Sequence, residues 1–366
     1  MQAPAPSHAS EVPWYAEAIT PAWMQSALAG QIADAEVKRL QILGGDDGSS
    51  YRRRKHIEWN QVGENAGLPE NVFTKSAPTF AMRLSGGIAA ASEGRFLLEV
   101  APTLPIEAPR CWYAKRDAAS GRAMQVMEDL TVSKDATFLN APAVVSIDTA
   151  KRMLDLLATL HGTFMARPET MPTWLGTYED FFNAAARSGI REAHFRAMEA
   201  AQKVLPRSLV GRGDAIWTTA VAQLALHATT PRTVIHSDVH PGNWYLTHAG
   251  QPGLCDWARV CRAHWARDVV YVLSSVLSIE DRRAGEMALL ASYAERLSVY
   301  SGQRFSVNQI REAMRQQLCA ALLMWTPTLC PPPTLPAMQP EAVSLEMISR
   351  IAAAIDDHDA INAGIS

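Results

Sequence analysis

The hydrophobic pattern of this chain changes near residue 130, and this change limits the folds that are open to it. Before residue 130, short alternating apolar and polar runs are separated by turns rich in glycine and proline, which is typical of strands. After it, apolar residues recur at helical spacing. A chain of 366 residues is long enough for two domains or one two-lobed unit. We expect an α+β fold, with a mixed β-sheet lobe at residues 1–130 and a helical lobe at residues 131–366.

The first part of the chain is predicted to form most of the strands. They are expected at residues 37–43, 51–59, 71–76, 110–114 and 123–127, with one helix at residues 88–100. Gly44, Gly45 and Gly48 predict a tight turn between the first two strands, because glycine adopts positive φ at little cost.

The second part is predicted to be helical, and its clearest helix covers residues 147–167. Apolar residues there follow the spacing i, i+3, i+4, i+7 and i+11, which indicates one buried face. Further helices are predicted at residues 178–188, 191–204, 214–229, 281–297, 307–324 and 341–356. Residues 233–256 differ, because short apolar strands there flank a polar loop.

The charge balance argues against a nucleic-acid or membrane partner. Lys and Arg number 34 and Asp and Glu 37, so the formal net charge is -3. Such a chain lacks the basic field that drives nonspecific binding to nucleic acids or anionic lipids. The longest strongly apolar run, residues 269–279, is shorter than the roughly 20 residues that span a bilayer.

The five cysteines indicate a reducing compartment. They are an odd number and form no C-x-x-C pair, which fits neither a disulfide framework nor a zinc ribbon. The first residues lack a basic segment followed by an apolar one, so no signal peptide is predicted. We expect a cytoplasmic protein.

The polar loop carries the residues best suited to chemistry. His236, Asp238, His240 and Asn243 form an H-x-D-x-H-P-x-N run, and Asp256 follows thirteen residues after Asn243 in an apolar strand. Phosphoryl transfer to an alcohol needs a carboxylate that orients the hydroxyl and accepts its proton. It also needs oxygen ligands that hold Mg²⁺ on the nucleotide phosphates. The residues of this segment provide both.

This spacing closely resembles the catalytic and metal-binding segments of the aminoglycoside phosphotransferase and choline kinase superfamily, which has a protein-kinase-like fold. The resemblance implies that Asp238 is the catalytic base and that Asn243 and Asp256 are Mg²⁺ ligands. It also implies ATP as the phosphate donor, bound between the lobes, with GTP left open. His236 and His240 are expected to hydrogen-bond the loop backbone.

The resemblance extends to the first part of the chain. Lys75 matches the strand lysine that such folds place against the α- and β-phosphates, and Glu93 matches its helical partner. The turn at residues 44–50 lies where a phosphate-covering turn belongs, so the hydroxyls of Ser49 and Ser50 are candidate phosphate contacts, although a plain hairpin turn explains them equally.

The segment around residue 128 resembles the connection between lobes whose backbone meets the adenine edge. Met127, Glu128 and Leu130 are therefore candidate nucleotide contacts, and a simple linker between lobes is the alternative.

Several looser segments between residues 35 and 300 resemble the ecdysteroid-kinase-like group, whose insect members phosphorylate steroid alcohols. This resemblance favours a small, apolar alcohol as acceptor, while an aminoglycoside or choline-type acceptor remains the alternative. The candidates to line the acceptor pocket are Trp174, Tyr178, Phe181, Trp257, Trp265 and Trp325, for each of which a core position is the simpler interpretation.

Two positions depart from the superfamily pattern. Ser237 stands where the aminoglycoside enzymes usually have glycine, and Asp268 only partly matches the aspartate that usually braces the catalytic loop. We interpret Asp268 as structural.

Two other functions remain open on the residues alone. His236, Asp238 and His240 alternate along an extended segment and would form a transition-metal site, as in a metallohydrolase. That reading leaves Asn243 and Lys75 unexplained. A nucleotide-binding pseudoenzyme on the same fold is the second alternative, and the presence of all the expected catalytic residues argues against it.

Overall fold

The computed structural model describes residues 5–47, 50–77, 79, 91–333 and 337–363. The chain divides into two compact units. Unit 1 comprises Met1–Thr137, Thr247–Gly250 and Cys255–Arg259, and unit 2 comprises Phe138–Leu246, Gln251–Leu254 and Val260–Ser366. The chain first passes from unit 1 to unit 2 within β6 (Thr137–Phe138). The predicted boundary at residue 130 lies a little earlier, at the start of α4 (Leu130–Ser133), and stays a prediction.

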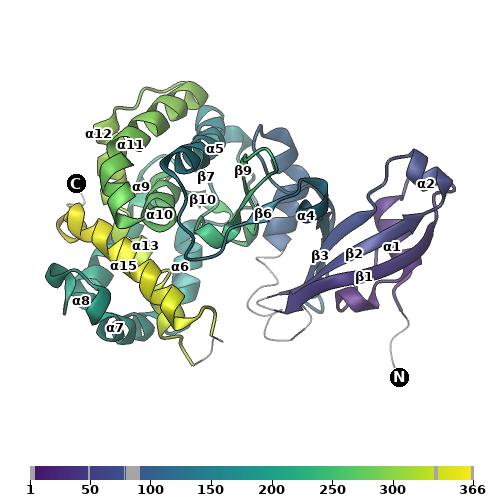
Figure 1. Cartoon of the computed structure of the whole chain (residues 1–366), viewed down its shortest axis with the longest axis horizontal. Coiled ribbons are helices and arrows are strands. Elements are labelled where there is room, and N and C mark those ends of the chain that lie inside the picture. Colours follow the sequence, from purple (N-terminus) through teal and green to yellow (C-terminus); the bar gives the residue numbers. More distant parts are fainter. Residues whose placement is uncertain (1–4, 48–49, 78, 80–90, 334–336, 364–366) are drawn as a thin grey trace. The chain divides into compact units, whose positions relative to one another are not determined.

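Unit 1 is built on a five-stranded antiparallel sheet with the strand order β1-β2-β3-β5-β4 (Figure 1). Its strands are β1 (Val37–Asp47), β2 (Tyr51–Trp59), β3 (Asn71–Ser76), β4 (Cys111–Arg116) and β5 (Ala123–Glu128). All five were predicted, β1 and β3 from the alternation of apolar and polar residues and the others from the turns beside them.

The first strand is longer than predicted. β1 continues through Gly44 and Gly45, whose φ values of 159° and 156° are nearly extended. Gly45 lies opposite Arg53, and a Cβ at Gly45 would lie 1.9 Å from the carbonyl oxygen of Arg52. These two glycines therefore permit close pairing of β1 with β2 and do not form the predicted turn. Gly48 lies outside the described residues.

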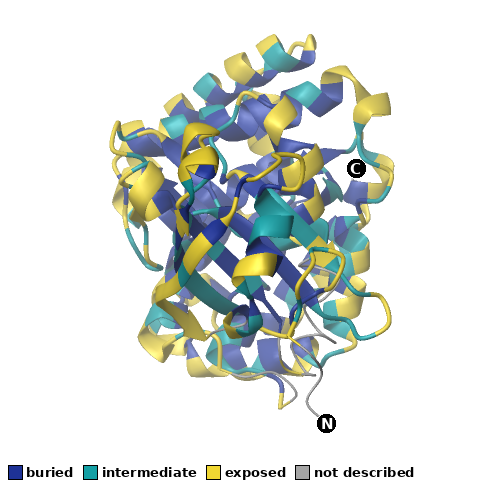
Figure 2. Cartoon of the chain, turned by 90° about the vertical axis from the view of Figure 1, so that its right-hand side faces the viewer, coloured by how far each residue is buried: buried dark blue, intermediate teal, exposed yellow. Residues whose placement is uncertain are grey.

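One face of this sheet is covered by a helix that the sequence analysis did not predict. α1 (Pro21–Leu28) begins at a proline, and the side chain of its N-cap Thr20 accepts a hydrogen bond from the backbone N–H of Trp23 at 3.1 Å. Trp23 packs with Ile57 and Val72 from the sheet in one apolar core, and all three are buried. Figure 2 colours the whole chain by burial, with buried residues in dark blue. Burial of these large side chains is the main stabilising contribution in this part of unit 1.

The remaining helical pieces of unit 1 are short. Residues 91–99 are helical and belong to the helix predicted at 88–100, of which residues 88–90 lie outside the described part. Besides α1 and α4, the other helices of unit 1 in the described part of the chain are η1 (Ala16–Ala18), α2 (Gln61–Asn65), η2 (Ala101–Thr103) and η7 (Trp257–Arg259).

Unit 2 is mainly helical, as predicted. Its helices are α5 (Ile147–Ala166), α6 (Tyr178–Ala186), α7 (Ile190–Ala200), α8 (Gly213–Leu224), α9 (Leu226–Thr229), α10 (Ala266–Val276), α11 (Ile279–Ser301), α12 (Val307–Arg315), α13 (Leu318–Leu322), α14 (Thr326–Leu329) and α15 (Glu341–Asp357), with the 3-10 turns η3 (Pro168–Thr170), η4 (Gln202–Val204), η5 (Arg207–Leu209) and η8 (Ala360–Asn362). The helices predicted at 214–229 and 307–324 are each divided in two. No helix among the described residues is long and apolar enough to cross a bilayer.

Helices α5 and α10 form much of the core of unit 2. α5 packs along α11, and its N-cap Ser146 accepts a hydrogen bond from the backbone N–H of Thr149 at 3.2 Å. Every residue of α10 is buried. The sequence analysis treated residues 269–279 only as an apolar run and did not predict this helix.

Short strands hold the polar loop in place. β7 (Thr233–Ile235) pairs antiparallel with β10 (Cys261–Ala263), and β8 (Trp244–Leu246) pairs antiparallel with β9 (Pro252–Leu254). The loop therefore runs from the end of β7 to the start of β8 through the single turn η6 (Pro241–Asn243). The chain continues from β9 through η7 (Trp257–Arg259) to β10.

Candidate active site

Unit 1 contains a cluster of three charged side chains around Lys75. Nζ of Lys75 lies 2.8 Å from Oε2 of Glu93 and 2.9 Å from Oδ1 of Asp256. These partners stand 18 and 181 positions away in the chain. The cluster thus combines a strand lysine, a helical glutamate and the aspartate that follows β9.

Much of this charged cluster is buried, which affects the pKa of its members. The side chain of Glu93 is 2% exposed and that of Lys75 is 11% exposed, whereas Asp256 is 37% exposed. Burial by itself would lower the pKa of Lys75, but the negative charges of Asp256 and Glu93 outweigh it, so the net effect raises this pKa. Lys75 therefore carries its positive charge at neutral pH, as binding of phosphate requires.

Neighbouring side chains fix the position of Glu93. Gln125 of β5 donates a hydrogen bond from Nε2 to Oε2 of Glu93 at 3.1 Å. The next residue, Gly94, lies against β4, where an added Cβ would be 2.3 Å from the Cβ of Ala114. Only glycine allows this close approach of the helix at 91–99 to the sheet.

Asp256 is held by the segment that follows it. The ring of Trp257 stacks on that of Phe96 with centroids 4.3 Å apart, and Phe96 belongs to the helix that carries Glu93. Asp256 has a φ of 56°, a left-handed backbone conformation that Asp adopts more readily than most residues. In the hairpin register Trp244 pairs with Leu254, so Asn243 and Cys255 are the residues just beyond its open end.

Unit 2 contains the polar loop with Asp238 and Asn243. The side chain of Asn243 donates from Nδ2 to the backbone carbonyl of Asp238 at 2.8 Å, which draws the two residues together. The hydroxyl of Tyr271 on α10 donates to Oδ1 of Asp238 at 3.4 Å. The sequence analysis did not identify Tyr271, because the position of a tyrosine within an apolar run does not indicate that it contacts a carboxylate.

A buried carboxylate anchors the start of the loop. Asp268 is completely buried and accepts hydrogen bonds at 2.8 Å from the backbone N–H groups of both His236 and Ser237. His161 on α5 lies 3.3 Å from the same carboxylate. Burial would raise the pKa of Asp268, but these hydrogen bonds and the nearby histidines more than offset this, so the pKa is lowered.

The hydrogen bonds to Asp268 also explain how a serine is accommodated at position 237, where the superfamily pattern has glycine. This residue has a φ of 65°, in the left-handed region where glycine costs least. The hydrogen bond from its backbone to Asp268 holds the serine in this conformation. Ser237 is therefore held in a backbone conformation that glycine adopts most easily.

His236 and His240 serve the loop backbone, as expected. Nδ1 of His236 accepts from the N–H of Asp238 at 3.3 Å, and Nδ1 of His240 accepts from the N–H of Gly242 at 3.1 Å. Within the described part of the chain, no group of three or more His, Cys, Asp or Glu side chains is arranged to hold a metal ion. The geometry thus gives the metallohydrolase alternative no support.

The other predicted nucleotide contacts have varied surroundings. Met127 is buried in β5, and Leu130 is buried at the start of α4. Oε2 of Glu128 accepts a hydrogen bond from the backbone N–H of Arg110 at 3.1 Å. Ser50 is buried, whereas Ser49 lies outside the described residues. Nucleotide binding by these residues stays a prediction.

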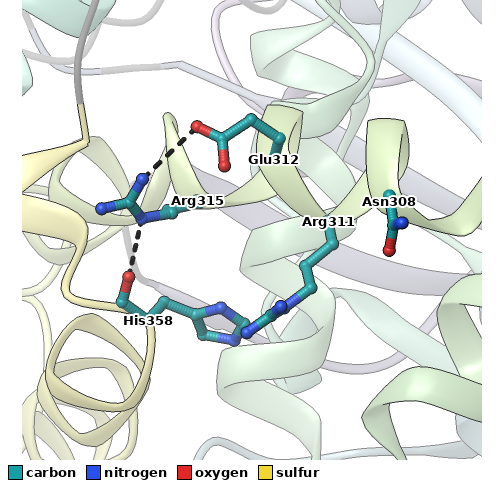
Figure 3. Close-up of a pocket in the computed structure, with 5 residues that line it drawn as sticks. All are labelled: Asn308, Arg311, Glu312, Arg315 and His358. Atoms are coloured by element: carbon teal, nitrogen blue, oxygen red, sulfur yellow. Dashed lines mark hydrogen bonds and ion pairs between the residues drawn. The ribbon is translucent and has the colours of Figure 1, made fainter.

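A pocket of about 460 Å³ lies elsewhere in unit 2 and contains none of the predicted site residues (Figure 3). It is lined by Asn308, Arg311, Glu312, Arg315 and His358. Nε of Arg315 donates to the carbonyl of His358 at 2.7 Å, which joins α12 to the end of α15. The pocket is therefore part of the packing between these helices.

Comparison with known proteins identifies the family. Residues 77–304 match the model of the phosphotransferase enzyme family. The chain belongs to this family. The match includes Glu93, Asp238, Asn243 and Asp256 and begins just after Lys75. The superfamily resemblance drawn from the loop is therefore confirmed, and the protein is a phosphotransferase.

One solved structure shows the same fold at low sequence identity, and a second is described beside it for comparison. A protein from Ralstonia eutropha described as an aminoglycoside phosphotransferase has a TM-score of 0.50 and 14% identity, over 91% of this chain and 96% of that one. A choline kinase from Streptococcus pneumoniae has a TM-score of 0.46 and 13% identity, over 87% and 94%. The predicted protein-kinase-like fold is confirmed for the phosphotransferase. A search of curated proteins finds no significant match.

Proposed function

We propose that this phosphotransferase is an ATP- and Mg²⁺-dependent kinase that transfers the γ-phosphate to a hydroxyl of a small, mainly apolar alcohol. One observation carries the proposal. Lys75, the expected phosphate-binding lysine, contacts Asp256, the expected metal ligand, at 2.9 Å. Because a nucleotide polyphosphate binds as a complex with Mg²⁺, a cation that meets the phosphates and a carboxylate that meets the metal must lie close together.

The residues present fit a magnesium ion. Mg²⁺ prefers oxygen ligands, and Asp256 provides a half-exposed carboxylate while Asn243 provides an amide oxygen. The amide nitrogen of Asn243 is bound to the carbonyl of Asp238, so its oxygen is the end suited to a metal. When bound, the metal would neutralise charge on the β- and γ-phosphates.

Asp238 has the role of the base in this proposal. Its carboxylate accepts a hydrogen bond from the acceptor hydroxyl, orients the oxygen towards the γ-phosphorus and receives the proton. Tyr271 and the loop anchored on Asp268 hold this carboxylate in position. An oriented hydroxyl reacts faster because the entropy of alignment is lost on binding and not in the transition state.

The apolar nature of the acceptor rests on the resemblance to the ecdysteroid-kinase-like group. We infer a steroid-like or similarly apolar alcohol from this resemblance.

The test combines nucleotide binding with phosphate transfer. We expect Mg²⁺ and ATP together to raise the melting temperature of the wild type, and Asp238→Asn to keep this shift while it loses about 10²- to 10⁴-fold in transfer to alcohols. Asp256→Ala should lose the Mg²⁺-dependent part of the shift. The exposed Asp214 offers the control Asp214→Asn, which should behave as wild type. Unchanged transfer by Asp238→Asn, or stabilisation by Zn²⁺ but by no nucleotide, would contradict the proposal.

A further inference from the structure

In the described part of the chain, the pocket between α12 and the end of α15 is lined by polar side chains alone (Figure 3). Its volume of about 460 Å³ has room for a small ion and several waters, since one water of the liquid occupies about 30 Å³. His358 follows α15 directly. The other lining residues belong to α12, and the spacing i, i+3, i+4 and i+7 places them on one face of that helix: Asn308, Arg311, Glu312 and Arg315.

Arg311 brings a positive charge that no described residue neutralises. It is exposed, and it forms no ion pair or hydrogen bond among the described residues. Figure 3 shows its side chain extending from α12 towards the ring of His358. Arg315 lies four positions further along the same face, and two like charges at this spacing destabilise a helix slightly. An anion bound in the pocket would remove this repulsion.

Arg315 is held in place while its charge is only weakly compensated. Its Nε donates to the carbonyl of His358 at 2.7 Å, and its Nη2 donates to that of Asp359 at 3.0 Å. The carboxylates of Glu312 and Asp359 lie 3.5 and 3.8 Å from its Nη atoms, and both are exposed. Ion pairs of this length and exposure are weak. The lining side chains therefore carry a net positive charge, two arginines against one glutamate.

His358 adds a buried nitrogen that lacks a partner. Its side chain is 3% exposed, and its Nε2 lies 2.7 Å from Oε1 of Glu286. Burial would raise the pKa of Glu286, but hydrogen bonds from His358 and Arg282 outweigh it, so the pKa is lowered and Nε2 donates to a carboxylate. The other ring nitrogen, Nδ1, is buried and has no hydrogen-bond partner among the described residues. An unsatisfied polar atom in the wall of a pocket indicates a ligand.

A second buried histidine of unit 2 shows the arrangement expected for a purely structural role. The ring of His194 is completely buried. Its Nδ1 lies 3.2 Å from the hydroxyl of Thr326, and its Nε2 lies 3.1 Å from the carbonyl of Gly213. Both nitrogens of His194 thus have a partner within the protein, whereas only one nitrogen of His358 does.

The free nitrogen of His358 limits the kind of anion that fits. In a neutral ring Nδ1 accepts a hydrogen bond, and in a protonated ring it donates one. Hydrogen phosphate suits both states, because it has one hydroxyl and three further oxygens. Sulfate and carboxylates have no proton at neutral pH and suit only the protonated ring. Oxyanions also match the planar N–H groups of arginine, which donate along parallel directions.

We propose that this pocket is a binding site for inorganic phosphate. Arg311 and Arg315 neutralise its charge, the amide of Asn308 donates to one of its oxygens, and Nδ1 of His358 accepts from its hydroxyl. The bound ion joins α12 to the end of α15 and stabilises this part of unit 2. None of these residues belongs to the proposed kinase site, so the phosphate site does not depend on the proposed function.

The first experiment follows the melting temperature of the whole protein at pH 8 against the concentration of phosphate, sulfate or chloride, at equal ionic strength and without nucleotide. We expect phosphate to stabilise the wild type more than sulfate or chloride does. Arg311→Gln should bind phosphate at least about tenfold more weakly, because it loses charge-assisted hydrogen bonds.

Arg304→Gln is the matched control for this charge change. Arg304 is exposed, precedes α12 and lies outside the pocket, so the variant should bind phosphate as the wild type does. Absence of a stabilisation specific to phosphate, equal stabilisation by sulfate, or an equal loss in Arg304→Gln and Arg311→Gln would overturn the proposal.

His358→Gln separates the roles of the two ring nitrogens. The glutamine amide still donates to Glu286, as Nε2 does, but has no atom in the place of Nδ1. We expect this variant to melt close to the wild type in chloride and to bind phosphate about threefold to tenfold more weakly. Undiminished binding would contradict the contact with Nδ1. If the variant does not fold, Arg311→Gln and its control carry the test.

The second experiment determines where phosphate binds. Phosphate should slow hydrogen exchange at residues 357–362, where α15 ends and η8 follows, and Arg311→Gln should abolish this effect. Lys75→Met changes the proposed nucleotide site and should keep the stabilisation by phosphate. A stabilisation that is lost in Lys75→Met and kept in Arg311→Gln would place the ion in the nucleotide site and overturn the proposal.

Discussion

At the scale of single residues, burial and neighbouring charges determine the pKa values of two lysines in this phosphotransferase. Lys75 keeps its positive charge because two carboxylates surround it, whereas Lys55 on β2 is 2% exposed and lacks comparable compensation. Burial lowers the pKa of Lys55 to about 8, only partly opposed by the charge of Glu17. The pKa values of two lysines on neighbouring strands are thus shifted in opposite directions, because one lysine has close negative charges and the other does not.

The ion pair of Lys75 yields the first prediction. Lys75→Met leaves Glu93 buried without its cation, so we expect the free energy of unfolding to fall by about 3 kcal/mol, as measured by urea denaturation. Lys38→Met is the matched control, because Lys38 pairs with Glu36 on the surface and should contribute less than about 1 kcal/mol. Similar losses for both variants would contradict the importance of burial at Lys75.

Lys55 yields a prediction on pH. A folded-state pKa below the unfolded value of 10.5 means that the unfolded chain binds more protons between pH 8 and 10.5, so this residue makes stability rise with pH in that window. The shift corresponds to roughly 3 kcal/mol of destabilisation at pH 7. Lys55→Met should therefore be more stable than the wild type at pH 7, with a difference that shrinks towards pH 10.5. A difference independent of pH, in denaturation curves at several pH values, would disprove this.

At the scale of elements, strand pairing and hydrogen bonds to the backbone hold the polar loop in position. The hairpin of β8 and β9 connects Asn243 to the segment of Asp256, and the loop before it is anchored on α10 through Asp268. α10 in turn packs on α5, which supplies His161. The loop that carries Asp238 therefore depends on the packing of α5 and α10.

Gly162 tests this packing. It lies in α5 where an added Cβ would be 2.4 Å from the Cβ of Tyr300 on α11. We expect Gly162→Ala to lower the free energy of unfolding by about 1–2 kcal/mol, because overpacking outweighs the better helix propensity of alanine. Gly176→Ala is the control, since its nearest atom would be 3.9 Å away, and it should be neutral or slightly stabilising. Thermal or urea denaturation of both variants decides the matter.

At the scale of the whole molecule, the five cysteines are all free thiols in the structure. Cys111, Cys261 and Cys319 are buried, while Cys255 and Cys330 are partly exposed. Burial raises the pKa of the thiols of Cys111, Cys255 and Cys319 to about 12. Reaction requires the thiolate, so these thiols are protected at neutral pH.

Thiol titration gives the corresponding prediction. We expect at most two thiols of the native protein to react quickly with a disulfide reagent at pH 8, with Cys330 first, and all five to react after unfolding in guanidinium. Cys330→Ser should remove the fastest phase. Rapid reaction of three or more thiols in the native state would show that the core is more open than the structure indicates.

Much of the local structure follows from sequence patterns. The strands of unit 1 were predicted from alternating residues and from turns, and helix α5 from a period of about 3.6 residues, because these periods report which face of an element is buried. The convergence of Asp238 and Asn243 was also predicted, because five residues of chain and one tight turn suffice to bring them together.

Long-range contacts were decided only by the tertiary structure. Lys75 meets Asp256 across 181 positions, and His161 on α5 meets Asp268 on α10 across 107 positions. The extension of β1 through Gly45 and the uniform burial of α10 also gave no local signal. The physical reason is that a periodic pattern records the burial of a face but not the partner that buries it, since the hydrophobic effect has no direction. The residue types and the loop thus specified a phosphotransferase, and the packing of the elements decided which charges meet.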